Sequence, residues 1–118
     1  MDPTQLLDLA SARAAVLCRD LTAEVAGVFP VIGGRLSTPH LLGVGGPCSV
    51  RLLPSDLFRT ALLYRAEQLV VVHNHLDGGP PSEADRRMTR RLRALGASLG
   101  LSLVGHVVVI GGAAHVVD

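Results

Sequence analysis

Two histidines separated by a single residue end an apolar run, and they are the first place where this sequence offers chemistry. The segment LVVVHNH (69–75) is apolar for four residues and then ends in His73, Asn74 and His75. Side chains alternate along a strand, so His73 and His75 would share one face, with Cα atoms about 6.5 Å apart. Two such imidazoles can bind one zinc ion at about 2.0–2.1 Å. A strand end that simply reaches solvent would also carry polar residues, so the pair alone leaves both interpretations open.

A serine and an aspartate downstream favour the metal interpretation. The segment PPSEAD (80–85) places Ser82 and Asp85 three residues apart at a predicted helix start. This spacing is typical of a capping box, which stabilises a helix by about 1 kcal/mol without any further role. Asp85 also lies one turn before Met88 and Thr89, beside the predicted buried stripe, where a carboxylate needs a partner. A cation held by the two histidines would provide one, and Ser82 could cap the helix while presenting its hydroxyl to the same pocket.

The elements that must position these residues follow from periodicity and turn signals. Helices are predicted at 4–19, at 56–67 after a start at Pro54, and at 83–99; strands are predicted at 23–32, 35–42, 69–75, 101–112 and 113–117. The last predicted helix would bury a stripe of Ala84, Met88, Leu92, Leu95 and Leu99. A chain of 118 residues with this mixture indicates one α/β or α+β domain.

Composition excludes several classes of function. The net charge of +1 disfavours bulk nucleic-acid binding, and all eleven basic residues are arginine, so no lysine is present for Schiff-base chemistry. Cys18 and Cys48 form no CxxC pair and are predicted to be buried thiols of a reducing compartment. The N-terminus lacks the features of a signal peptide, and no apolar run is long enough to span a membrane. We therefore expect a cytoplasmic protein that does not enter membranes.

The pattern HNHxxxxxxSxxD resembles the metal motif of the JAMM domain, which is also called MPN or JAB. The segments LLPSDLFRTALLYRAEQLVVVHNH and PPSEADRRMTRRLRALGASLGLSLVGHVVVIGG are similar to the RadC branch of that family. The resemblance covers residues 21–118 and leaves an N-terminal helix within 1–20. It implies a curved mixed β-sheet flanked by helices, and a zinc ion bound by His73, His75, Asp85 and a water. It also implies that Ser82 stabilises an oxyanion while an amide or isopeptide bond of a peptide or protein is hydrolysed.

The resemblance leaves one position open. The family uses a glutamate from an earlier strand to accept a proton from the water, and counting back from Pro54 places that position at His40. His40 could replace the base, could become a fourth ligand that makes the zinc structural, or could be a bystander on a half-buried strand. The alternative to a hydrolase is therefore a catalytically silent MPN module that serves in binding or as a scaffold.

Other polar residues have weaker assignments. His106 is expected to be a hydrogen-bonded, partly buried residue near the site rather than a ligand, and His115 to be structural or exposed. Glu67 should lie at the end of its strand opposite the histidines. Glu24 would be a candidate base only if the first strand ran beside the site. Asp77 would be a rim residue or a partner of an imidazole.

Two surface features bear on partners. Five arginines at helical spacing are expected to form a solvated face, or at most a weak nucleic-acid contact: Arg86, Arg87, Arg90, Arg91 and Arg93. The apolar run from Val107 to Ile110 has no charge that would oppose strand pairing between molecules, which makes a homo-oligomer an open prediction.

Overall fold

The computed structural model describes residues 1–45 and 52–117. In chain order its elements are α1 (Pro3–Cys18), β1 (Val25–Ile32), β2 (Arg35–Leu36), β3 (His40–Val44), α2 (Pro54–Leu63), β4 (Gln68–His75), α3 (Glu83–Ser98), β5 (Ser102–Ile110) and β6 (Ala113–Val117). This mixture confirms the predicted fold class.

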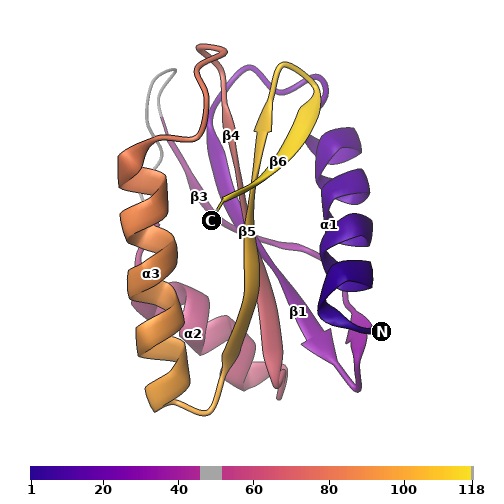
Figure 1. Ribbon diagram of the computed structural model, residues 1–118, viewed down its shortest axis with the longest axis vertical. Helices are drawn as coiled ribbons and strands as arrows, with labels where there is room; N and C mark the ends of the chain where they lie inside the picture. The colour runs from indigo at the N-terminus through magenta and orange to yellow at the C-terminus, as the bar shows by residue number, and fades with distance from the viewer. Residues whose placement is uncertain (46–51, 118) are drawn as a thin grey trace.

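The strands form one mixed, curved sheet (Figure 1). Its order is β2-β1-β4-β5-β6, and β3 pairs with β1 on the same side as β2. Strands β4 and β5 are parallel, because the chain crosses over through α3 between them, and the other pairs are antiparallel. The pairing of β1 with β4 matters most for function, since it brings the first strand beside the histidine-bearing strand.

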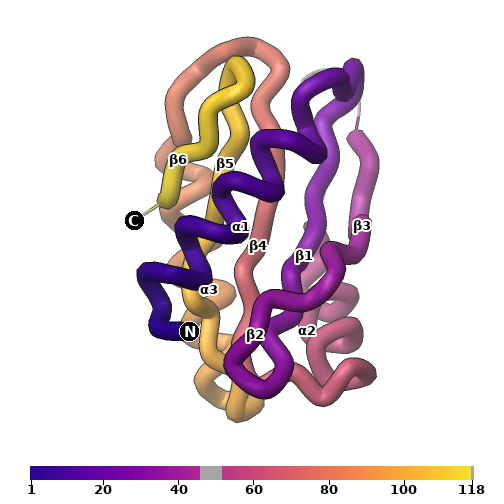
Figure 2. The backbone as a smooth tube through the Cα atoms, turned by 90° about the vertical axis from the view of Figure 1, so that its right-hand side faces the viewer, coloured from indigo at the N-terminus to yellow at the C-terminus, as the bar shows by residue number. Residues whose placement is uncertain are grey.

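Helices cover both faces of this sheet. Helix α1 packs on one face through Leu6, Ala10 and Ala14, and Figure 2 shows it crossing in front of β4 and β5. Gly105 on β5 allows this approach, because a Cβ atom there would lie 2.5 Å from the side chain of Leu7. Helices α2 and α3 lie on the other face (Figure 1). The sheet therefore lies between two apolar cores, one on each face.

The alternation along β4 is the one that the sequence predicts. Val70 and Val72 pack in the core under α1, whereas Val71 packs in the core under α2 and α3. His73 and His75 continue the face of Val71 and lie at the carboxyl end of the strand. The helix that follows, α3, begins at the same end of the sheet (Figure 1).

The region predicted as one strand at 35–42 is divided. A short β2 and a separate β3 occupy the region, and both pair with β1. The register of the β1–β3 pair shifts between Ala26 and Gly27, where the carbonyl oxygen of His40 comes within 2.8 Å of the position a Cβ on Gly27 would take. A bulge of this kind strengthens the local twist and changes the direction of the strand.

The buried side of α3 also differs from the predicted stripe. Thr89, Leu92 and Gly96 are buried, whereas Leu95 and Leu99 are exposed. Gly96 faces the chain after the helix, since a Cβ there would lie 2.6 Å from the carbonyl oxygen of Leu101. Together with the polar contacts of Thr89 described below, this contact explains why the buried face of α3 differs from the face that the apolar pattern predicts.

Three further predictions can be placed in the fold. Cys18 is half-buried, and burial raises the pKa of its thiol, whereas Cys48 lies outside the described residues. Val107, Val108 and Val109 are buried in β5, which is paired on both sides by β4 and β6, so this run is not a free edge. Among residues 1–45 and 52–117, no helix is both long enough and apolar enough to cross a membrane.

Candidate metal centre

Three ligand-type side chains converge at the carboxyl end of β4. The Nε2 atoms of His73 and His75 are 3.0 Å apart. The carboxylate of Asp85 faces both rings, with Oδ1 3.1 Å from His73 Nε2 and Oδ2 3.2 Å from His75 Nε2. The structure thus brings together the three residues that the sequence pattern singled out as ligands, and their ligand atoms all lie within 4.8 Å of one another.

The chemistry and spacing of this donor set fit a divalent metal ion. Zinc at about 2.0–2.1 Å from tetrahedral ligands separates those ligands by about 3.3 Å, close to the spacing of the three donor atoms here. The Nδ1 atom of His75 lies 3.2 Å from the carbonyl oxygen of Gly79, which can only accept a hydrogen bond. The proton of this ring therefore sits on Nδ1, and its Nε2 presents a lone pair. Three protein ligands also leave a coordination position open, as in catalytic sites.

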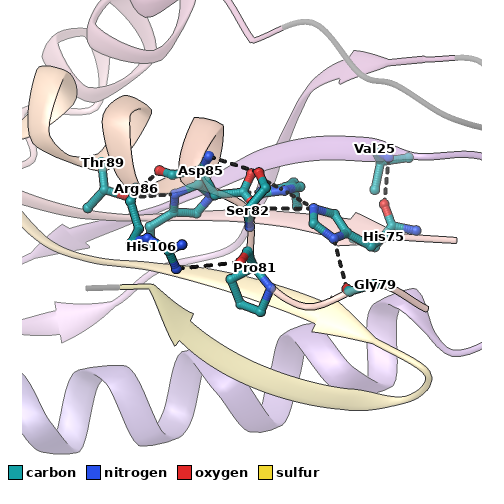
Figure 3. Close-up of polar contacts among 11 residues, drawn as sticks. Val25, His75, Gly79, Pro81, Ser82, Asp85, Arg86, Thr89 and His106 are labelled. Carbon is teal, nitrogen blue, oxygen red and sulfur yellow. Dashed lines mark hydrogen bonds and ion pairs between the residues drawn. The ribbon is translucent and has the colours of Figure 1, made fainter. Parts of the chain in front are cut away.

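The start of α3 fixes the aspartate. Ser82 is the N-cap, its Oγ accepts a hydrogen bond from the Asp85 amide at 3.1 Å, and its own amide donates to Asp85 Oδ2 at 2.7 Å (Figure 3). The predicted capping box is confirmed, and it leaves Oδ1 facing His73. Although burial opposes ionisation of Asp85, the hydrogen bonds from Ser82 and the nearby imidazoles give it a lowered pKa. The carboxylate is therefore ionised near neutral pH.

The loop between β4 and α3 orients the second histidine. Asp77 Oδ1 accepts a hydrogen bond from the Gly79 amide at 2.9 Å, and the Gly79 carbonyl contacts His75. Gly78, between them, adopts a positive φ of 73°, which glycine reaches without strain. Asp77 thus acts on the imidazole indirectly, through the turn that it stabilises.

A buried polar pair lies behind the first histidine. His73 Nδ1 is 2.7 Å from His106 Nε2, and His106 Nδ1 is 2.9 Å from the Thr89 hydroxyl. Figure 3 shows Thr89 on α3 beside His106 on β5. His106 is buried and hydrogen-bonded beside His73, outside the group of three donors, close to the position that the sequence suggested. Burial lowers the pKa of His73 to about 4 and that of His106 to about 3, so both rings are neutral near pH 7.

Glu24, a candidate base only if the first strand ran beside the site, lies close to the donor cluster. Ala26 pairs with His73 across β1 and β4, and the same antiparallel register continued by two residues places Glu24 opposite His75. Glu24 is only 5% exposed, and it lines a cavity of about 230 Å³ together with His75 and Ser82. Within the described ranges, 1–45 and 52–117, the Glu24 carboxylate makes no hydrogen bond or ion pair. Among the described residues no buried side-chain oxygen lacks a hydrogen-bond partner, so the unpaired oxygens of this buried residue are accessible, and Glu24 lines the cavity at the donor cluster.

Asn74 ties the backbone around this glutamate to β4. Its side chain points to the face opposite the two histidines, accepts from the Val25 amide at 2.7 Å and donates to the Ala23 carbonyl at 3.2 Å. The carbonyl of Glu24 accepts from the Gly45 amide at 2.8 Å. Residues 23–25 are therefore held from both sides.

The structure does not bring His40 to the donor cluster. His40 lies on β3, which is separated from β4 by β1, and it pairs with Val28. Its ring packs at a tilt of 38° against that of Tyr64, the C-cap residue of α2, with the ring centroids 4.4 Å apart. Two strand spacings are about 9.5 Å, too far for a ligand or a direct hydrogen bond. The cavity that His40 lines is a different one of about 310 Å³, shared with residues of α1 and β1.

The remaining candidates lie elsewhere. Glu67 accepts from the Gly34 amide at 3.1 Å, at the opposite end of β4. His115 is exposed on β6. On α3, Arg86 and Arg90 pair with Glu83 at 3.0 and 3.3 Å, which reduces the positive charge of the arginine face.

Comparison with known proteins agrees with this arrangement. A family model described as the RadC-like JAB domain matches residues 10–117. A UPF0758 protein from Thermotoga maritima is 40% identical over 95 residues, which cover 80% of this chain and 38% of that protein. A UPF0758 protein from Salinibacter ruber is 33% identical over 102 residues, covering 80% and 42%. The chain spans about two fifths of the length of these curated relatives. The chain belongs to the RadC-like JAB domain family.

Proposed function

We propose that this domain is a zinc-dependent hydrolase that cleaves an amide or isopeptide bond of a peptide or protein. The observation that carries the proposal is Glu24, a buried residue just before β1 that lines one cavity with His75, a member of the donor cluster of His73, His75 and Asp85. Two imidazoles and one carboxylate with an open position are a ligand set typical of catalytic zinc. When bound, zinc lowers the pKa of a water to about 7 and polarises a carbonyl oxygen.

Glu24 is the proposed proton acceptor in place of His40. A general base must lie within hydrogen-bond reach of the proton that it takes, directly or through one water. Glu24 meets this requirement better, because it lines the same cavity as His75, whereas His40, on β3 two strands away from β4, packs against Tyr64. After accepting a proton from the attacking water, Glu24 would deliver it to the leaving amine, which must be protonated before it departs.

Ser82 is the proposed oxyanion donor. Its Oγ accepts from the Asp85 amide, so its hydroxyl proton is free to donate to an oxygen in the cavity that it shares with Glu24. A donor aimed at developing negative charge contributes most where water is excluded. The helix cap thus holds the hydroxyl oxygen in place while leaving its proton available.

A catalytically silent module is the alternative. It would keep the fold, with or without a structural zinc, and act only in binding or as a scaffold. This alternative was suggested because position 40, where the family's glutamate was expected, is a histidine. The position of Glu24 beside the donor cluster supports the hydrolase instead.

The test is an assay of the purified, zinc-loaded chain on fluorogenic peptides and on an isopeptide-linked lysine conjugate. The proposal expects hydrolysis by the native chain, loss of that hydrolysis in Glu24→Gln with zinc retained, and activity kept in His40→Gln. Zinc binding without hydrolysis of either substrate class would support the silent module. Loss of hydrolysis in His40→Gln, with hydrolysis kept in Glu24→Gln, would assign the role of the base to His40.

A further inference from the structure

The buried contacts behind His73 determine where its proton lies. Thr89 Oγ1 is 2.8 Å from the carbonyl oxygen of Asp85. A carbonyl oxygen carries no proton, so the threonine hydroxyl must donate to it. That hydroxyl has a single proton, and it is used in this bond. At 2.9 Å from His106 Nδ1, the Thr89 oxygen therefore accepts, and the proton of the His106 ring lies on Nδ1.

The direction of the next hydrogen bond follows. A neutral imidazole carries one N–H, so His106 Nε2 has a lone pair. His73 Nδ1, 2.7 Å away, must then donate to it. The lone pair of His73 is left on Nε2, the atom that faces His75 and Asp85. The Gly79 carbonyl fixes His75 in the same tautomer.

We propose that Thr89 and His106 form a relay that holds His73 in its metal-binding tautomer. They are positioning residues, since neither contributes a ligand atom to the donor cluster. The inference deepens the proposed function, on whose metal site it rests. It gives a role to two of the four polar or charged residues that are buried in the described part of the chain. The relay starts on the backbone carbonyl of one candidate ligand, Asp85, and ends on another, His73.

A purely structural role of Thr89 and His106 would predict a different effect on metal affinity. If Thr89 and His106 only satisfied each other in the core, their removal would lower stability and leave the metal affinity of the folded protein unchanged. Outer partners of metal-binding histidines typically change metal affinity by about 10–100-fold when they are removed. The two accounts therefore differ in a quantity that does not depend on hydrolysis.

Thr89→Val and Thr89→Ser are the matched pair for the test. Valine has the shape of threonine without the hydroxyl, so the Nδ1 proton of His106 loses its acceptor. Moving that proton to Nε2 would relieve the buried donor, but it would also push the His73 proton onto the ligand nitrogen. Serine keeps the hydroxyl and the relay. A second pair, His106→Leu and His106→Gln, compares loss of the acceptor with an amide that can replace it.

Zinc affinity is measured by competition with a chromophoric chelator, and folding of each variant is checked by circular dichroism. The expected result is an affinity about 10–100-fold weaker in Thr89→Val, close to native in Thr89→Ser, and higher in His106→Gln than in His106→Leu. Equal affinities in folded Thr89→Val, Thr89→Ser and native protein would overturn the relay and leave the zinc site intact.

Imidazole ¹⁵N spectra of the native chain provide a second readout that needs neither metal nor variant. The relay requires the Nδ1–H tautomer of His106 and of His73 in the metal-free protein near pH 7. An Nε2–H tautomer of His106 would overturn it. If the native chain binds no zinc, the proposed function fails, and these spectra still decide whether the relay exists.

Discussion

Asn74 accepts a hydrogen bond from the Val25 amide at 2.7 Å, across the 49 residues that separate them in the sequence. Its amide group also donates to Ala23, so one side chain holds the backbone on both sides of Glu24. The middle residue of the HNH tripeptide thus positions the proposed base, while the outer two supply candidate ligands on the opposite face of β4. The candidate base and the candidate ligands are therefore linked through one strand.

Asn74→Ala should lower the catalytic rate and leave zinc affinity near the native value. The change removes both hydrogen bonds and frees Glu24 to move from the cavity, at a stability cost of about 1–3 kcal/mol. Rates and zinc affinities are compared with those of Val70→Ala, which weakens the core on the same face of β4 without touching residues 23–25. Equal losses of catalytic rate in the two variants would show that Asn74 has only a structural role.

Ser82→Ala should separate two functions of one hydroxyl. Loss of the N-cap should destabilise the protein by about 1 kcal/mol. Loss of the oxyanion donor should lower the rate by about 10²–10³-fold, far more than that change in stability explains. Ser82→Thr keeps a hydroxyl on a good capping residue and serves as the control in urea unfolding and in the peptide assay. A rate in Ser82→Ala close to native would remove Ser82 from the chemistry.

The metal-free protein should lose stability as pH falls below about 6.5, the usual pKa of histidine in an unfolded chain. Burial lowers the pKa of folded His73 to about 4 and that of His106 to about 3. Over this interval the unfolded chain binds protons that the folded chain does not, so the free energy of unfolding decreases with decreasing pH. Each histidine contributes a slope of up to about 1.4 kcal/mol per pH unit.

Urea titrations in a chelator measure this slope. His115→Gln changes an exposed histidine and should preserve the slope. A free energy of unfolding that stays constant over the same pH interval would contradict the buried, neutral state of His73 and His106.

Local patterns predicted that the three candidate ligands come together, because each pattern rests on short-range geometry. Alternation along a strand places His73 and His75 on one face, and the capping box places Asp85 at the first turn of α3. Both are set by residues within three positions of each other. The predicted fold class follows in the same way from the succession of strands and helices.

Glu24 was only a conditional candidate because its position depends on strand pairing between distant residues. The first strand was predicted at 23–32, but nothing in its own sequence shows that it pairs with β4 in the register Ala26 to His73. Counting along the chain instead selected His40, which lies on a strand two positions away from β4. The signal that could have found Glu24 is an acidic residue immediately before a buried strand, combined with an antiparallel neighbour that ends in HNH.

The sequence alone also did not indicate the proposed relay of Thr89 and His106. Thr89 interrupts the apolar stripe of α3, where a helical pattern favours Met88 as the buried residue. Its burial is explained by the hydrogen bonds to Asp85 and His106, which depend on α3 packing against β5.

Zinc stoichiometry tests the central claim most directly. The native chain, purified and exposed to zinc, then desalted, is analysed by inductively coupled plasma mass spectrometry beside His73→Ala and the control His40→Ala. The account predicts one zinc per native chain and per His40→Ala chain, and almost none in folded His73→Ala. A native chain without zinc, or a His73→Ala variant that binds it as the native chain does, would contradict the metal centre on which the proposed function depends.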